Sequence, residues 1–343
     1  MVEFFWKGLH WVPQSVLFLS REEGGQGLVH LASRTAVFRM QFLQKYLLSP
    51  SDIVWRDVAS CILRRVSGLG LDAALFLTNF SFLKLKGLPR FYQSVFKSCA
   101  LFKLHRSKTH NSLHWLLEEP LVCGARMDVC DGTLPGLSEA LCRSGTVTVR
   151  KLVEAAEPDF NNIMAVGSLL GVRSARLTRR FLDRVKERLT AGERQLLQLH
   201  SIGQREPDPT DPFPDVYMEP VFAEDSGPLL CSTAPKMMLC STSPKVLYKM
   251  NVKVINKRTL RDRPVTIWGD KLGGQRPQWR TLYKPPVRKR TGDLQWRILH
   301  GAIATNSFLS VISPGVLNTC PFCNSPESVF HVFMECVRLT GFF

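Results

Sequence analysis

The feature of this sequence that most constrains its folding is a group of four metal-ligating residue types close together. Cys320, Cys323, His331 and Cys336 follow the spacing C-x2-C-x7-H-x4-C. A C-x2-C pair lets two sulfur atoms from one tight turn reach the same ion, and the run from Asn324 to Pro326 is rich in turn-forming residues. The pattern therefore predicts that residues 320–336 fold around a bound metal ion.

Zinc is the metal that this ligand set favours. Zinc binds thiolates and imidazoles in a tetrahedron of four, and catalytic zinc keeps one position open for water. Because all four positions are filled here, we predict a structural zinc knuckle, with His331 and Cys336 on one face of a helix. The alternative is that the four residues are unliganded in a helical tail.

The composition indicates a folded protein without a disulfide framework. The chain has 343 residues, of which 45% are hydrophobic and 22% charged, and this is typical of globular proteins of about two domains. Ten cysteines are too few for a disulfide scaffold and indicate a reducing compartment. The sequence has neither a signal-peptide pattern nor an apolar run long enough to span a bilayer. We therefore expect a protein that is neither secreted nor a membrane protein.

Charge is distributed unevenly along the chain, whose net charge is +16. Residues 203–244 hold seven acids, two cations and eight prolines, which predicts an acidic proline-rich connector. Residues 245–290 hold fourteen cations against Asp262 and Asp270. Such an excess of cations favours an acidic partner.

The basic segment, residues 245–290, combines cations with aromatic residues, and this combination is typical of proteins that bind RNA or single-stranded DNA. The predicted contacts are Lys245, Lys249, Lys253, Lys257, Arg258, Arg261, Arg263, Arg288, Lys289 and Arg290, with Trp279 and Tyr283 as stacking residues. The lysines at i, i+4 spacing would form one basic stripe without acidic partners. Two alternatives stay open: the aromatics belong to a core, or residues 282–290 form a nuclear-import signal.

Hydrophobic spacing predicts mainly helices, with little strand. Leu31, Phe38, Phe42 and Tyr46 share one helix face, which we expect to be buried. The alternating run from Thr146 to Val149 predicts a short strand.

Three helix starts are predicted further along the chain. Ser174 is the expected N-cap of one helix, and Thr190 with Glu193 forms a capping box for the next. A third helix is expected to begin at Ser243 and Pro244. The buried residues predicted for the first helix are Leu177, Phe181, Leu182, Val185 and Leu189, and those for the third are Leu247, Asn251 and Val254.

Both ends of the chain resemble one family. Residues 291–339 resemble the zinc-binding region that follows the reverse transcriptase of LINE-type retrotransposons, above all vertebrate elements of the Tx1/L1 clade. The residues that carry this resemblance are Trp296, Leu299, His300, Gly301, Thr305, Leu309, Cys320, Cys323, Glu327, His331, Phe333 and Cys336. Residues 4–31 resemble the segment just past the polymerase thumb, with a turn at Gly24, Gly25, Gly27 and Leu28.

The resemblance implies a mainly α-helical, post-polymerase fragment with minor β structure. Its expected parts are a helical region (1–202), the acidic connector (203–244), the basic segment (245–290) and a zinc-binding domain (291–343). The family's polymerase needs an Asp-Asp pair in its palm, and this sequence holds no such pair. We therefore expect no enzyme activity from this chain alone.

The function implied by the resemblance is binding of element RNA, or of an RNA–DNA junction, to position a template for target-primed reverse transcription. The expected partners are RNA or single-stranded DNA and the missing polymerase portion, without a membrane or a small-molecule substrate. The expected location is a ribonucleoprotein in nucleus and cytoplasm. The alternatives are a stand-alone zinc-finger protein that binds a protein or duplex DNA, and an inert relic of a decayed element.

Overall fold

A computed structural model describes residues 12–48, 53–107, 112–129, 136–156, 159–203, 228–232, 237–261, 265–339 and 341. The chain divides into two compact units. The first unit comprises Met1–Leu31 and Val252–Phe343, and the second comprises Ala32–Asn251. The boundaries predicted from composition at residues 203, 245 and 291 stay predictions. Most of the predicted connector, residues 204–227 and 233–236, lies outside the described residues.

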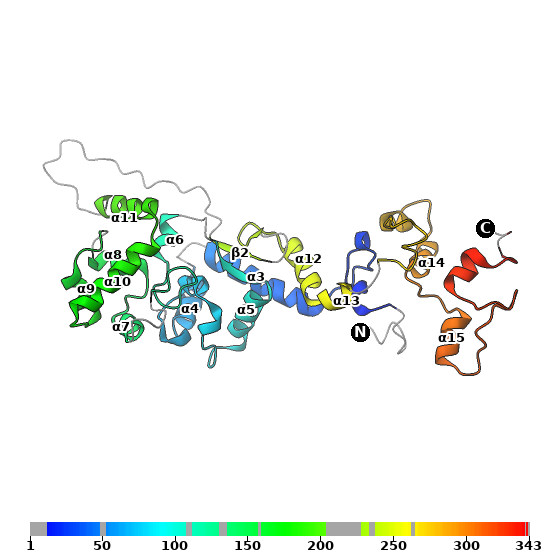
Figure 1. Cartoon of the computed structure of the whole chain (residues 1–343), viewed down its shortest axis with the longest axis horizontal. Helices are drawn as coiled ribbons and strands as arrows, with labels where there is room; N and C mark the ends of the chain where they lie inside the picture. The colour runs from blue at the N-terminus through cyan, green and yellow to red at the C-terminus, as the bar shows by residue number, and fades with distance from the viewer. Residues whose placement is uncertain are drawn as a thin grey trace. The chain divides into compact units, whose positions relative to one another are not determined.

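The second unit is built mainly from helices around one hydrophobic core (Figure 1). Helix α9 contacts α7, α8 and α10, so these four helices form a local bundle. The helices are α3 (Leu31–Leu48), α4 (Val54–Leu63), α5 (Arg90–Leu101), α6 (Leu113–Leu117), α7 (Leu137–Ser144), α8 (Val149–Ala156), α9 (Ile163–Leu170), α10 (Ala175–Arg188), α11 (Ala191–Gly203) and the start of α12 (Pro244–Ile255), with short 3-10 turns η2 (Val66–Gly68), η3 (Ala73–Leu77) and η4 (Phe80–Phe82). The prediction of a mainly α fold is confirmed.

A small antiparallel sheet is the β structure of the described residues. Its strands β1 (Leu104–Arg106), β2 (Leu229–Cys231) and β3 (Met237–Met238) lie in the order β1-β2-β3. Leu104 pairs with Cys231, and Leu230 pairs with Met238. The predicted strand at Thr146–Val149 is wrong, because Val149 begins α8 and only Thr148 makes an isolated bridge, to Pro120.

The predicted buried face of α3 is only half correct. Phe42 packs edge-on against Phe91 with ring centroids 4.9 Å apart, and Tyr46 is 1% exposed. Leu31 and Phe38, however, are 65% and 51% exposed. The buried stripe runs instead through Ser33, Ala36, Val37, Met40, Leu43 and Leu47. Spacing identified the helix but not its buried face: Phe42 contacts Trp55 of α4 and Phe91 of α5, and spacing along α3 does not show such contacts.

The helix starts predicted at residues 174 and 190 are confirmed. The Ser174 hydroxyl accepts a hydrogen bond from the Leu177 backbone N–H at 3.3 Å. Glu193 accepts one from the Thr190 backbone N–H at 2.9 Å, and the Thr190 hydroxyl accepts one from the Glu193 N–H at 3.3 Å. This reciprocal pair is a capping box. The predicted core residues Phe181, Leu182, Val185 and Leu189 of this region are buried, and Leu177 packs against the same core.

Two ion pairs lie in the interior of the second unit. Arg106 donates from Nε to Glu119 at 3.2 Å, and both side chains are almost fully buried. Arg126 donates to both carboxylate oxygens of Glu193, so the carboxylate that caps α11 is also tied to residue 126. Removing one partner of such a pair leaves an uncompensated buried charge.

The first unit consists of short elements around a small core of Val12, Val16, Leu17, Trp279, Trp296 and Ala302. Its elements are α2 (Gln14–Leu17), η1 (Arg21–Glu23), the end of α12, α13 (Lys257–Arg261), η5 (Trp279–Tyr283), α14 (Lys289–Leu299), α15 (Asn306–Ile312) and the helical turn η6 (His331–Glu335). The predicted start of α12 is confirmed, with Leu247 and Asn251 fully buried and Val254 partly buried. Across the described ranges, every helix is too short or too polar to cross a lipid bilayer.

Candidate metal centre and basic segment

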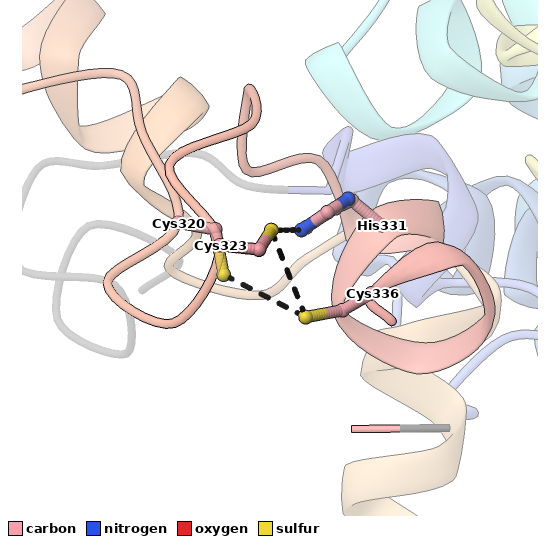
Figure 2. A group of neighbouring side chains, drawn as sticks. All are labelled: Cys320, Cys323, His331 and Cys336. Atoms are coloured by element: carbon pink, nitrogen blue, oxygen red, sulfur yellow. Dashed lines mark hydrogen bonds between the residues drawn. The ribbon is translucent and has the colours of Figure 1, made fainter. Parts of the chain in front are cut away.

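The first two candidate ligands lie on a tight turn in the first unit. The Cys320 backbone N–H donates to the Ser325 carbonyl at 2.7 Å, and the Asn324 N–H donates to the Cys320 carbonyl at 2.9 Å. Asn324 adopts a left-handed conformation with φ of 57°, which asparagine tolerates better than most residues. The turn presents Cys320 and Cys323 to the same side, as expected from the C-x2-C spacing (Figure 2).

The other two ligands sit at the two ends of a single π-helical turn. His331 begins η6, and Cys336 follows its last residue. The Cys336 N–H donates to the His331 carbonyl at 2.8 Å, which is an i to i+5 bond. In an α-helix, residues five apart point about 140° away from each other. The wider turn removes most of this angle, so the predicted shared helix face is achieved through π rather than α geometry.

All four ligand atoms converge (Figure 2). Cys323 Sγ lies 3.1 Å from His331 Nε2. Cys336 Sγ lies 3.9 Å from Cys320 Sγ and 3.9 Å from Cys323 Sγ. The four atoms all lie within 4.8 Å of one another, and tetrahedral zinc places its sulfur ligands about 3.8 Å apart. The geometry and the donor set therefore fit a bound metal ion.

The local electrostatics favour a thiolate at one of the cysteines. Hydrogen bonding from the Ser325 backbone lowers the pKa of the Cys323 thiol to about 6. Burial raises the pKa of the Cys320 thiol. A metal ion binds the thiolate form of cysteine. The lowered pKa of Cys323 therefore favours its thiolate at neutral pH, whereas Cys320 loses its proton when the metal ion binds.

Glu327 and Asn306 tie α15 to this turn. The Asn306 backbone N–H donates to Glu327 Oε1 at 2.9 Å, and the Asn306 side-chain amide donates to the Thr319 carbonyl at 2.8 Å. Glu327 thus acts as the N-cap acceptor of α15 from outside the helix. Trp268 packs at 4.6 Å against Phe330, the residue before His331. The sequence pattern assigned no role to Asn306, and it placed Trp268 among the aromatic residues of the basic segment without indicating its contact with Phe330, which lies 62 positions away.

A second cluster joins the two sequence regions that carried the family resemblance. Trp296 Nε1 donates to the Gly24 carbonyl at 2.8 Å, and His300 Nε2 lies 2.8 Å from the same oxygen. Trp279 stacks on His300 with centroids 4.9 Å apart and rings 10° from parallel. Gly24 has φ of 83°, and a Cβ there would lie 2.7 Å from Trp279 Cε2. Glycine is therefore required both by the backbone conformation and by the close approach of Trp279.

The predicted nucleic-acid contacts divide into cations and aromatics. The exposed cations are Lys245, Lys249, Lys253, Lys257, Arg258, Arg261, Arg288, Lys289 and Arg290, and Arg263 lies outside the described residues. Lys253 forms an ion pair with Glu23, which corrects the expectation that the lysine stripe lacks acidic partners. Glu23 is more than two hundred positions away in the sequence, so the spacing of the lysines gave no sign of it.

The aromatic contacts fit the prediction less well. Trp279 is only 4% exposed and belongs to the core of the first unit, so its prediction as a base-stacking residue is wrong. Tyr283 is half-buried: its hydroxyl accepts a hydrogen bond from Gln26 Nε2 at 3.0 Å, and Arg21 covers its ring at 5.1 Å. Burial raises the pKa of this phenol. Its predicted contact with nucleic acid stays a prediction.

The chain is similar along almost its whole length to a known protein, the "Transposon TX1 uncharacterized 149 kDa protein" of Xenopus laevis. The identity is 30% over 350 aligned residues, which cover 99% of this chain and 26% of the relative. The chain is homologous to part of this Tx1 transposon protein. This confirms the family expected from the two ends of the sequence.

The Tx1-type chain spans about a quarter of the relative's length. No protein-family model matches the chain, and no solved structure matches it. The assignment of residues 291–343 to a reverse transcriptase zinc-binding domain therefore stays a prediction, whereas the homology to a Tx1 transposon protein supports a retrotransposon origin.

Proposed function

We propose that this chain is the post-polymerase portion of a LINE-type reverse transcriptase and binds RNA or single-stranded DNA. In this role it holds a template in place for target-primed reverse transcription, while the polymerase and endonuclease sites lie elsewhere in the longer protein. The similarity to a Tx1 transposon protein supports the origin of the chain in a retrotransposon protein. The observation that carries the binding proposal is the group of exposed cations at the start of α14.

Arg288, Lys289 and Arg290 occupy the N-cap and the first two positions of α14, and its first turn contains no acid. The first backbone N–H groups of a helix have no acceptor within the helix, and they carry the positive end of its dipole. Three cations at this position are repelled by the positive end of the helix dipole and by one another. A phosphate group offsets both costs, because it accepts hydrogen bonds from the free N–H groups and neutralises the side chains.

The second part of the proposal is that the metal ion is zinc, held by Cys320, Cys323, His331 and Cys336. Bound zinc supplies folding free energy, because the ligand set does not exist in the unfolded chain. Since the four residues fill its tetrahedron, they leave no position for substrate, and we assign the site a structural role. The knuckle then fixes α15 through Glu327 and Asn306.

A binding titration tests this function against its rivals. The purified chain is titrated with RNA, single-stranded DNA and duplex DNA of one sequence at several salt concentrations. We expect the single strands to bind more tightly than the duplex, with an affinity that falls steeply as salt rises. A zinc-finger protein that recognises duplex DNA would instead prefer one base sequence, through contacts with the base edges. An absence of binding to any of the three at physiological salt would refute the proposal.

A protein partner is a second candidate, favoured by apolar side chains exposed around the knuckle. These are Val311 (84% exposed), Leu317 (78%), Val337 (75%), Phe322 (60%) and Met334 (58%). Groups of exposed apolar residues often mark protein interaction sites. The missing remainder of the longer transposon protein is the partner that we propose for them. Co-purification of that remainder with the wild-type chain, but not with Leu317→Glu, tests this candidate.

A further inference from the structure

A cavity of about 470 Å³ lies within the first unit, lined by residues of α2, η1, α12, α13 and η5. Its apolar lining includes Val16, Leu19, Leu260 and Pro277. This volume is within the range of small-ligand pockets and is large enough for a nucleobase with its sugar. The basic residues on its border belong to the segment that we propose to bind a single strand.

The charged residues of the cavity favour an anionic ligand. Lys253, Lys257, Arg261 and Arg276 line it together with Glu22 and Glu23. Both carboxylates already have cationic partners, since Glu23 pairs with Lys253 and Glu22 pairs with Arg280. The lining therefore keeps an excess of positive charge after these pairs are formed. All four cations of the lining are exposed, so they can reach a phosphate at the cavity mouth.

The apolar part of the lining favours a ligand group that is enclosed by aliphatic side chains over one that stacks on an aromatic ring. Trp279 lines the cavity but is only 4% exposed, with His300 stacked on it and Gly24 in close contact. A ligand therefore meets aliphatic side chains and the edge of the indole rather than an open ring face. A planar group with two apolar faces and a nearby phosphate satisfies both parts of the lining.

We infer that this cavity accepts one unpaired nucleobase of a bound single strand, with the adjoining phosphate at Lys257 and Arg276. The inference rests on the proposed function and deepens it. It predicts that part of the binding affinity depends on the base, in addition to the part that is due to phosphate contacts. Phosphate contacts alone do not distinguish a normal strand from one without bases. A base enclosed by apolar side chains contributes roughly tenfold to affinity.

The test compares two single strands of equal length, oligothymidylate and its abasic counterpart. Both carry the same phosphates, so only the base-dependent share differs. The cavity is filled by Val265→Trp, a lining residue that is 43% exposed and can accept a larger side chain at the border. The matched control is Val58→Trp on α4, outside the cavity, where the valine is 55% exposed.

We expect the wild-type chain and the control to bind oligothymidylate roughly tenfold more tightly than the abasic strand. Val265→Trp should lose this preference while keeping its affinity for the abasic strand. A second variant, Leu19→Ala, shortens a partly buried aliphatic side chain of the lining and should reduce the preference as well, because it removes apolar contact with the base. This variant keeps the test valid if Val265→Trp fails to fold.

Three outcomes would overturn the inference. Equal affinity of the wild-type chain for both strands would exclude a base from the cavity. This result is expected if the cavity instead accepts a side chain of a protein partner. The proposed binding to the phosphate backbone would still stand. A preference that survives in both cavity variants would place the base elsewhere. Loss of wild-type binding to both strands would refute the proposed function itself, and the inference with it.

Discussion

The indole of Trp296 donates a hydrogen bond to the backbone carbonyl of Gly24 at 2.8 Å, across 272 positions of the sequence. The same oxygen lies 2.8 Å from His300 Nε2, so one carbonyl of a glycine-rich turn receives two ring nitrogens of α14 and its C-cap. This contact holds the beginning of the described chain against the region that precedes the knuckle.

Replacing Trp296 with Phe removes the donor but keeps an aromatic ring in the core. We expect a loss of about 1–2 kcal/mol in the local stability of the first unit, from the broken hydrogen bond and the smaller ring. Amide hydrogen exchange in residues 289–299 should become roughly 5- to 30-fold faster. Trp55→Phe, at a residue that is 37% exposed, is the control and should leave this exchange unchanged.

Gly24 and Gly27 form a matched pair for a test of close packing. Both have positive φ, 83° and 67°, but a Cβ at Gly24 would overlap Trp279 whereas one at Gly27 meets no atom within 4 Å. Gly27→Ala should cost about 1 kcal/mol from backbone strain alone. Gly24→Ala should cost about 1–3 kcal/mol more, because the core must move. Equal unfolding midpoints in urea for the two variants would contradict the packing of Trp279 on Gly24.

The capping carboxylate of α11 predicts a pH-dependent stability. Burial raises the pKa of Glu193, but hydrogen bonds from Thr190 and the Arg126 guanidinium outweigh burial and lower this pKa below its ordinary value of 4.5. A lowered folded-state pKa means that the stabilisation is complete above about pH 4.5 and is lost as pH falls through the folded-state pKa.

Glu193→Gln should therefore lower the free energy of unfolding by about 1–2 kcal/mol at pH 7 and by less at acid pH. Urea unfolding monitored by circular dichroism between pH 3 and 7 gives this difference. Glu187→Gln, at an exposed position of α10, is the control. The account of Glu193 fails if the wild-type chain and Glu193→Gln lose stability in parallel over this range.

Cys323→Ser should abolish zinc binding, because three remaining ligands with a weak hydroxyl no longer fill the tetrahedron. Elemental analysis of the purified protein should give one zinc per chain for the wild type and for the control Cys61→Ser, an exposed cysteine of α4. Removal of zinc with a chelator should speed hydrogen exchange in residues 318–336. Equal zinc content in Cys323→Ser and wild type would exclude the proposed ligand set.

Local patterns allowed correct predictions, and long-range packing limited them. Ser174, the Thr190–Glu193 box and the four ligands of the knuckle were predictable, because each depends on residues within a single stretch of at most 17 positions. The buried face of α3 was predicted incorrectly at Leu31 and Phe38, since the spacing of residues along one helix does not show which side later parts of the chain cover.

The aromatics of the basic segment show the same limit. Trp279 lies between cations in the sequence and was predicted to stack on bases. Its burial depends on Gly24 and His300, which no local pattern connects to it. Only the resemblance to a known family had singled out Gly24 and His300, without indicating that they meet.

The salt dependence of single-strand binding tests the central claim most directly. Log affinity should fall linearly with log salt, with a slope of about −0.7 for each phosphate neutralised. If Arg288, Lys289 and Arg290 all contact phosphates, their replacement by alanine should flatten the slope by roughly two units. The control with equal change in charge is the alanine variant of Arg176, Arg179 and Arg180, exposed on α10 in the other unit, and it should leave the slope unchanged. An equal slope in the wild type and in the variant of residues 288–290 would contradict the claim that this cluster grips a nucleic-acid backbone.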